Sequence, residues 1–247
     1  MGKFSGIILA SDLDGTLLNS GLKIDGHNKR AIEYFVNNGG IFTLATGRTK
    51  KAAGAYIKEL PINAPVILYN GGLIYDSETD RALKVNELDF GFMDIIRDVK
   101  ALFPDIGIEL YTPDEMFTVQ LSEKTIEHYR NINVELKLIE TSEVRAPLIK
   151  AFLAHTPERI AEAGRYFTAK YGELLSITYS SPCFLEITGK NVDKGEALRA
   201  LSESLSIRPG GICAIGDSLN DFIMVKRSDI SFAPQNAYEE VKREASY

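Results

Sequence analysis

The chemistry that this sequence suggests begins with two aspartates, Asp12 and Asp14, which stand one residue apart near the N-terminus. They follow an apolar run at residues 7–10, which has the length of a buried strand, and they precede Gly15, which permits a sharp turn. Alternate residues of a strand point to the same side, so both carboxylates are expected together at the end of this strand. Because two like charges so close are unfavourable, the pair indicates a site that binds a cation or shares a proton.

Two further groups of polar residues stand where a strand is expected to end or a helix to begin. The segment Thr46-Gly47-Arg48 offers a hydroxyl and backbone N–H groups just before a predicted helix, an arrangement that binds anions. Lys194 stands in the first turn of a helix that Asp193 is expected to begin. A cation in that turn opposes the helix dipole, so Lys194 is better explained by a bound anion than by helix stability.

The fourth group, Asp217 and Asp221, lies in the loop that follows an apolar strand expected at residues 211–215. A hard divalent cation would account for so many carboxylates, because Mg²⁺ prefers a few carboxylates together with water and phosphate oxygens. A carboxylate beside such an ion can attack phosphorus, and a second one can protonate the leaving oxygen. Thr46 and Lys194 would then hold the phosphoryl group that is transferred.

The elements that must position these loops alternate between strand and helix. Strands are expected to be short and almost entirely apolar, which is typical of a parallel sheet buried on both faces. The expected order at the N-terminal end is a strand at 7–10, a helix at 25–38, a strand at 41–46, a helix at 49–60 and a strand at 66–69. The same pattern resumes with a helix from Asp193, a strand at 211–215, a helix at 221–226 and a strand at 230–232. This order predicts an α/β fold with a doubly wound parallel sheet.

Between these two stretches the strands become alternating or half-polar. Helices are expected at 90–102, 123–131 and 157–171, and strands at 107–111, 116–120, 148–154 and 184–188. Mixed strands that pack on helices on one side indicate an inserted α+β domain with an antiparallel sheet. We therefore expect a catalytic domain made of residues 1–82 and 188–247, and an inserted domain made of residues 83–187.

Composition narrows the class of protein. The chain has 247 residues, 45% of them hydrophobic, and a net charge of −6, which argues against nucleic acid as a partner. No apolar run reaches the length of a membrane span and no signal peptide is evident, so we expect a cytoplasmic protein without membrane contact. The two cysteines lack metal-site spacing and are expected to be buried free thiols, and the three histidines share no ligand spacing. The oligomeric state is left open.

The four groups together resemble the motifs of the haloacid dehalogenase-like hydrolase superfamily, in particular its Cof-type sugar-phosphatase branch. The resemblance rests on the segments 12–18, 46–48, 194–195 and 216–221, in that order along the chain. It implies a Rossmann-like core with a large α/β cap inserted before the lysine motif, and a Mg²⁺-dependent phosphatase. In the family the chain usually continues beyond the equivalent of residues 237–247 through another strand and a short terminal helix.

The resemblance also implies a role for each motif residue. Asp12 would be the nucleophile and a metal ligand, and Asp14 the acid–base, with its backbone carbonyl on the metal. Asp217 would bind the metal directly, and Asp221 would support or join the metal ligands. The residues implied to bind the substrate phosphate are Thr46, Gly47, Lys194 and Asn220, and those implied to face the rest of the substrate are Asn70, Gly71 and Arg48. Arg48 could instead pair with one of the loop carboxylates.

Three functions remain open at this stage. The first is a phosphatase that acts on a small phosphorylated metabolite, such as a sugar phosphate, through an aspartyl-phosphate. The second is a phosphomutase that returns the phosphoryl group to a sugar hydroxyl. The third is a receiver-like domain in which Asp12 accepts a phosphoryl group as a signal, although such domains lack a large insertion.

Overall fold

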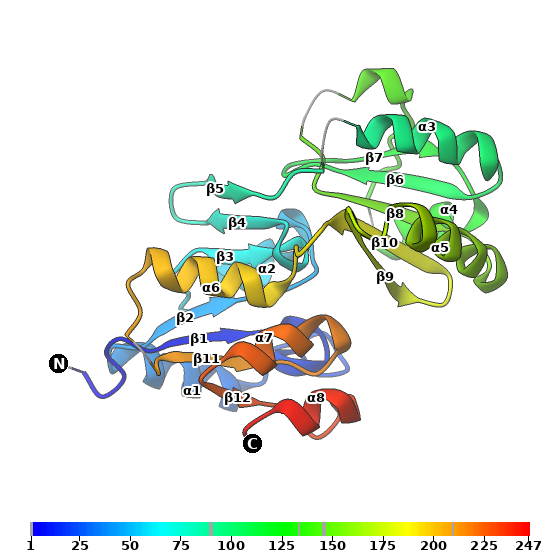
Figure 1. The fold of residues 1–247 in the computed structure, drawn as a ribbon. Helices are drawn as coiled ribbons and strands as arrows, with labels where there is room; N and C mark the ends of the chain where they lie inside the picture. The colour runs from blue at the N-terminus through cyan, green and yellow to red at the C-terminus, as the bar shows by residue number, and fades with distance from the viewer. Residues whose placement is uncertain (1, 89–90, 133, 145–146, 209) are drawn as a thin grey trace. The chain divides into compact units, whose positions relative to one another are not determined.

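The structure, a computed structural model, describes residues 2–88, 91–132, 134–144, 147–208 and 210–247. Its internal contacts divide the chain into two compact units (Figure 1). The core unit comprises Met1–Lys84 and Val192–Tyr247, and the cap unit comprises Val85–Asn191. The core unit is therefore built from two stretches of chain that the whole cap unit separates.

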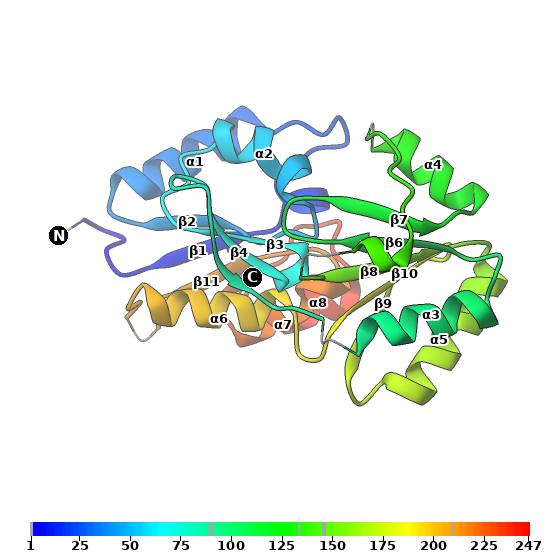
Figure 2. The same cartoon turned by 90° about the horizontal axis from the view of Figure 1, so that it is seen from above.

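A parallel four-stranded sheet in the order β12-β11-β1-β2 forms the centre of the core unit. Its strands are β1 (Ile8–Ser11), β2 (Ile41–Leu44), β11 (Ile212–Ile215) and β12 (Ile230–Phe232). Helices α1 (Gly26–Asn37) and α2 (Lys50–Glu59) lie on one face, and α6 (Lys194–Ser204) and α7 (Phe222–Arg227) on the other (Figures 1 and 2). The doubly wound parallel sheet is confirmed, and its buried strands explain the continuous apolar runs.

Side-chain caps determine where the core helices begin. The carboxylate of Asp25 accepts a hydrogen bond from the N–H of His27 at the start of α1, and the hydroxyl of Thr49 accepts one from the N–H of Ala52 at the start of α2. Asp193 caps α6 in the same way. Each cap satisfies a backbone donor of the first turn, so the loop before the helix ends at a defined residue. These caps hold the polar loops at the carboxyl edge of the sheet.

The third predicted strand of the core is present as β3 (Val66–Leu68), and a parallel bridge between Ala45 and Ile67 joins it to the parallel sheet. It also forms an antiparallel sheet with β4 (Leu73–Asp76) and β5 (Arg81–Val85). Strands β4 and β5 were not predicted. β5 is exposed along most of its length and has no apolar face to produce a pattern, whereas β4 is a short buried strand that directly follows β3. A short helix α8 (Glu239–Glu244) follows β12, and the N–H of Tyr247 donates to the carbonyl of Ser231 beyond it.

The cap unit is built on a five-stranded antiparallel sheet in the order β7-β6-β8-β10-β9, as the prediction of an inserted α+β domain requires. Its strands are β6 (Gly107–Tyr111), β7 (Met116–Gln120), β8 (Lys150–Ala154), β9 (Leu175–Ser181) and β10 (Phe184–Gly189), and its helices are α3 (Phe92–Leu102), α4 (Glu123–Asn131) and α5 (Pro157–Tyr171). Phe90, where the first of these helices was predicted to begin, lies outside the described residues. The other two helices have the predicted bounds, whereas β9 was not predicted.

The two faces of the cap sheet differ in character. Helices α3 and α5 pack their apolar side chains, among them Ile96 and Phe167, on one face, and α4 lies on the other (Figure 2). The α4 face carries buried ionic groups: Glu109 contacts the imidazole of His128 at 3.0 Å, and Lys150 contacts Glu186 at 3.2 Å. His128 is thus a half-buried partner of the buried carboxylate of Glu109.

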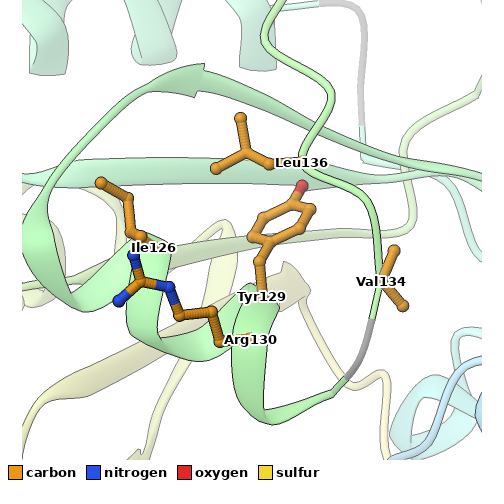
Figure 3. A pocket seen from close by; sticks show the side chains of 5 residues that line it. All are labelled: Ile126, Tyr129, Arg130, Val134 and Leu136. Atoms are coloured by element: carbon orange, nitrogen blue, oxygen red, sulfur yellow. The ribbon is translucent and has the colours of Figure 1, made fainter.

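A pocket of about 410 Å³ lies beside α4 in the cap unit (Figure 3). It is lined by Ile126, Tyr129, Arg130, Val134 and Leu136, none of which is a predicted site residue. Cys183 is half-buried and Cys213 is buried, and both are free thiols. Among the helices of the described residues, none has both the length and the apolar character needed to cross a bilayer.

Candidate active site

Three buried carboxylates meet at the carboxyl edge of the core sheet. Asp12 follows β1, and Asp217 and Asp221 follow β11; one oxygen of each lies within 4.8 Å of the others. The N–H of Asp12 donates to the carbonyl of Ile215 at 3.0 Å, so the ends of the two strands are joined directly. Parallel pairing of β1 with β11 therefore explains why residues so distant in the sequence form one acidic cluster.

Lys194, from the first turn of α6, lies within this cluster and is fully buried. Its Nζ donates to Asp12 Oδ1 at 2.7 Å and to Asp221 Oδ1 at 2.6 Å. Burial disfavours its charged form, but the charges of Asp12 and Asp221 outweigh this effect and hold the pKa of Lys194 above its ordinary value. Burial also raises the pKa of Asp12 to about 6, against the opposing charge of Lys194.

Hydrogen bonds from neighbouring loops orient the other two carboxylates. Thr16 Oγ1 donates to Asp217 Oδ1 at 2.6 Å, and Ser218 Oγ donates to Asp217 Oδ2 at 2.9 Å. Asp221 Oδ2 accepts from the backbone N–H groups of Asp217 and Ser218 at 3.1 and 3.0 Å. The second oxygen of Asp221 thus holds its own loop in shape while the first binds Lys194.

Three residues in and around the acidic cluster were not predicted to have a role: Thr16, Ser218 and Asn236. Asn236 Nδ2 donates to the carbonyl of Gly15 at 2.7 Å and so ties the loop after β12 to the loop after β1. Asn236 could have been predicted from its position in the sequence. It follows the predicted strand at 230–232, and ligands bind beyond the carboxyl ends of the strands in such sheets.

The cluster fits a divalent cation. Three carboxylates face one ammonium group, which leaves two negative charges when all four groups are ionised. Such an excess in a buried position is unfavourable without a further cation, and carboxylate oxygens are the ligands that hard divalent ions prefer. The side chain of Asp14 is not part of the cluster, and the expected contribution of its backbone carbonyl stays a prediction.

Asp14 lies in a different environment from Asp12. Strand β1 ends at Ser11, and the chain enters an irregular helical turn at Leu13–Leu17, so the alternation of strand side chains does not extend to the pair. The carboxylate of Asp14 is half exposed and accepts two hydrogen bonds from Arg48, at 2.7 Å from Nε and 2.6 Å from Nη2. Arg48 was predicted either to face the substrate or to pair with a loop carboxylate, and in the structure it pairs with the carboxylate of Asp14.

The remaining predicted residues lie in the loops after β2, β3 and β11. Thr46 is buried, and its Oγ1 accepts a hydrogen bond from the N–H of Arg48 at 3.1 Å. Asn220 Nδ2 donates to Asn70 Oδ1 at 3.0 Å, which joins the loop after β11 to the loop after β3. A Cβ on Gly47 would lie 2.9 Å from Asn70 Oδ1. The structure thus brings Thr46, Gly47, Asn70 and Asn220 together.

Gly71 lies next to the start of α6. Its φ of +99° belongs to the left-handed region, and a Cβ there would lie 2.3 Å from the carbonyl oxygen of Asp193. Only glycine allows this approach, which joins the loop after β3 to the residue that precedes Lys194.

Gly15 offers a direct test of the cluster's geometry. Its φ is +82°, and a Cβ would lie 2.5 Å from Asp217 Oδ2. We expect Gly15→Ala to displace the Asp217 carboxylate and weaken cation binding, measured as the Mg²⁺ concentration that gives half of the maximal rise in melting temperature. Gly210 is the matched control, because its φ is +76° and no atom lies within 4 Å of its Cβ position. An equal Mg²⁺ response in Gly15→Ala and Gly210→Ala would contradict the expectation.

The core unit combines a doubly wound parallel sheet with a buried acidic cluster, and the chain of the cap unit is inserted between its two stretches. The chain belongs to the haloacid dehalogenase-like hydrolases, whose family profile matches residues 9–247. It is a phosphatase of this family, of the Cof type.

Relatives of known sequence match over nearly the whole chain. YxeH of Bacillus subtilis is 28% identical over 253 residues, which cover 97% of this chain and 91% of YxeH. YcsE of Bacillus subtilis, named as a 5-amino-6-(5-phospho-D-ribitylamino)uracil phosphatase, is 25% identical, with 97% of this chain and 88% of YcsE covered. The crystal structure of TM0651 from Thermotoga maritima has a TM-score of 0.86 at 29% identity and covers 97% of this chain and 90% of its own. The cap unit is thus part of what these proteins share with this chain.

Proposed function

We propose that this protein is a Mg²⁺-dependent phosphatase that hydrolyses a small phosphorylated metabolite, such as a sugar phosphate, through an aspartyl-phosphate on Asp12. The observation that carries the proposal is the contact of Asp12 with Lys194 inside a buried cluster that also holds Asp217 and Asp221. A nucleophilic carboxylate needs a positive environment to approach a phosphate dianion, and Lys194 provides part of it.

In the first step, an Asp12 oxygen forms a bond to phosphorus while the ester P–O bond breaks. The electron pair of that bond stays on the leaving oxygen, which takes a proton from Asp14. In the second step, Asp14 takes a proton from a water molecule, whose oxygen bonds to phosphorus as the bond to Asp12 breaks. Inorganic phosphate leaves, and both carboxyl groups return to their initial states. A bound divalent cation, held by Asp12 and Asp217 with Asp221 in support, would supply positive charge beside the transferred phosphoryl oxygens.

The neighbouring loops would bind the two parts of the substrate. Thr46, Gly47, Lys194 and Asn220 are proposed to hold the phosphoryl group, and the contact between Asn70 and Asn220 supports a shared site. Asn70 and Gly71 are proposed to face the rest of the substrate. The cap unit would select among metabolites, and the ribityl phosphate in the name of YcsE supports a phosphate ester of a small polyhydroxylated molecule.

The proposed function is tested by a screen of phosphorylated metabolites for phosphate release, run with Mg²⁺ and with EDTA. We expect release from at least one small phosphate ester, and its loss in EDTA. Adding a sugar acceptor separates hydrolysis from mutase activity, because a mutase would form a new sugar phosphate and release less inorganic phosphate. An aspartyl-phosphate that lasts for hours without turnover would contradict the proposal and favour a phosphoacceptor domain.

The raised pKa of Asp12 predicts a pH-dependent response to Mg²⁺. The folded metal-free protein holds the Asp12 proton up to about pH 6, so the stability from this proton is complete below 3.8 and is lost as pH rises through about 6. A cation needs the ionised carboxylate, so we expect the rise in melting temperature caused by Mg²⁺ to grow between about pH 5 and about pH 7. Asp12→Asn, which has no proton to release, should show no such growth. A Mg²⁺ effect independent of pH in the unsubstituted protein would contradict this prediction.

A further inference from the structure

We propose that Arg48 is a positioning residue that acts through Asp14, and that it holds the acid–base carboxyl in place rather than contacting the phosphoryl group. The inference rests on the proposed function, because it assigns Arg48 a part in the proton transfer of that reaction. On this inference, the loss of Arg48 slows aspartyl-phosphate formation most for leaving groups that most need a proton from Asp14.

The first observation is the geometry of the pair. Arg48 Nε donates to Asp14 Oδ2 at 2.7 Å and Nη2 donates to Asp14 Oδ1 at 2.6 Å. Two parallel hydrogen bonds from one planar group fix the plane of the carboxylate as well as its position. The Asp14 side chain is 48% exposed, so without Arg48 it would have room to adopt other rotamers.

The second observation is that Arg48 is itself held. Its Nη1 donates to the carbonyl of Ala52 at 3.3 Å, and its guanidinium lies over the ring of Tyr56 at 4.8 Å. The hydroxyl of Tyr56 in turn donates to the carbonyl of Leu22 at 3.1 Å. Helix α2 therefore supports the guanidinium through both a carbonyl and an aromatic ring.

All three guanidinium nitrogens of Arg48 thus already donate within the protein, two of them to Asp14. To bind a phosphoryl oxygen with the same fork, Arg48 would have to release the residue that delivers the proton. A lysine, Lys194, is already fully buried in the acidic cluster and touches the proposed nucleophile. These contacts favour different roles for the two cations: Lys194 binds the phosphoryl group, and Arg48 positions the carboxyl group of Asp14.

The pair can remain in contact throughout the proton transfer. When Asp14 carries its proton on one oxygen, the other oxygen still accepts from Arg48. As the ester bond breaks, the proton moves to the leaving oxygen, which keeps the electron pair of that bond, and the second hydrogen bond to Arg48 forms again. Arg48 would thus stay hydrogen-bonded to both the protonated and the ionised form of Asp14, without itself exchanging a proton.

This arrangement predicts that the effect of Arg48 depends on the leaving group. Nitrophenolate is a stable anion and needs little help from an acid, whereas the phenolates of phenyl and methoxyphenyl phosphate need more. We expect Arg48→Met to slow formation of the aspartyl-phosphate about 100-fold for the poorer leaving groups, within the range of general acid catalysis, and only a few-fold for p-nitrophenyl phosphate. The nitrophenyl and methoxyphenyl esters have similar sizes, so a difference between these two reports the leaving group rather than the fit of the aryl ring.

The experiment measures aspartyl-phosphate formation in single turnovers by rapid quench, for the three aryl phosphates, with Arg48→Met, Asp14→Asn and the double variant. We expect the double variant to be no slower than Asp14→Asn alone, because Arg48 has no partner to position once the carboxyl is gone. Arg48→Lys, which retains the charge but not the fork, should recover only part of the rate. Lys29→Met is the control, since it removes a cation from an exposed ion pair with Glu59 at 3.9 Å in the same unit.

Tyr56→Leu provides a second route to the same test, should Arg48→Met fold poorly. It leaves Arg48 and Asp14 in place but removes the supporting ring, so it should slow the poorer leaving groups more than p-nitrophenyl phosphate, though less than Arg48→Met does. A loss equal for all three substrates, or one that adds fully to the loss in Asp14→Asn, would overturn the inference and assign Arg48 to the phosphoryl group. The absence of any aspartyl-phosphate in the unsubstituted protein would instead refute the proposed function, and the inference with it.

Discussion

Asp12→Asn is expected to lower phosphate release at least about 1000-fold, because an amide cannot act as the nucleophile that forms the phosphoenzyme. The folded state should persist, since Lys194 keeps its second partner, Asp221, at 2.6 Å. The measurement is the rate of phosphate release under saturating Mg²⁺, together with trapping of the phosphoenzyme in acid. We expect no phosphoenzyme in the variant.

The control for this variant is Asp98→Asn, which removes one carboxylate from an exposed position on α3. Its rate should equal that of the unsubstituted protein. If Asp12→Asn retained more than a few per cent of the activity, Asp12 would not be the nucleophile. A different nucleophile, either another side chain or water, would then have to attack phosphorus.

Lys194→Met is expected to lower the free energy of unfolding by about 3–5 kcal/mol, the usual cost of breaking a buried ion pair from one side. Lys194 is fully buried, and its loss would leave the Asp12 and Asp221 carboxylates facing each other without a cation. Mg²⁺ should restore part of this stability, because it adds positive charge to the same cluster. The measurement is urea unfolding with EDTA and with Mg²⁺.

Two further variants separate the charge effect from packing. Adding Asp221→Asn to Lys194→Met removes one of the unpaired carboxylates, so the double variant should be more stable than Lys194→Met alone. Lys29→Met removes an exposed lysine and should change the free energy of unfolding by less than about 0.5 kcal/mol. A loss in Lys194→Met that Mg²⁺ leaves unchanged would indicate a packing defect rather than unpaired charge.

The core elements could be predicted because each has a strong local signal. Strands β1, β2 and β11 are continuous apolar runs, and the helices beside them begin at capping residues that the sequence displays. Strand β9 was missed although residues 175–180 alternate between apolar and polar residues, the pattern of a strand with one buried face. Only Leu175 of this strand is fully buried, so it lacks the continuous apolar run that marked the core strands.

The acidic cluster could be predicted for a related reason. Parallel strands have their carboxyl ends at one edge of the sheet, so Asp12 and Asp217 were expected to lie close together although they are far apart in the sequence. The partners of each carboxylate could not be predicted, because they depend on side-chain directions within loops. Thr16 binds Asp217 and Arg48 binds Asp14 only because the turn after β1 sends the side chains of neighbouring residues in different directions.

The division of the core unit by the cap unit has a consequence for biosynthesis. Strand β1 pairs on one side with β2, which is made soon afterwards, and on the other with β11, which is made only after the entire cap unit. A chain that emerges from the ribosome N-terminus first therefore carries Asp12 long before Lys194, Asp217 and Asp221 exist. If the cap unit folds on emerging, it shortens the loop that β11 must close to reach β1. The acidic cluster can then form only after the cap unit and β11 have been made, and the nascent chain remains inactive until that point.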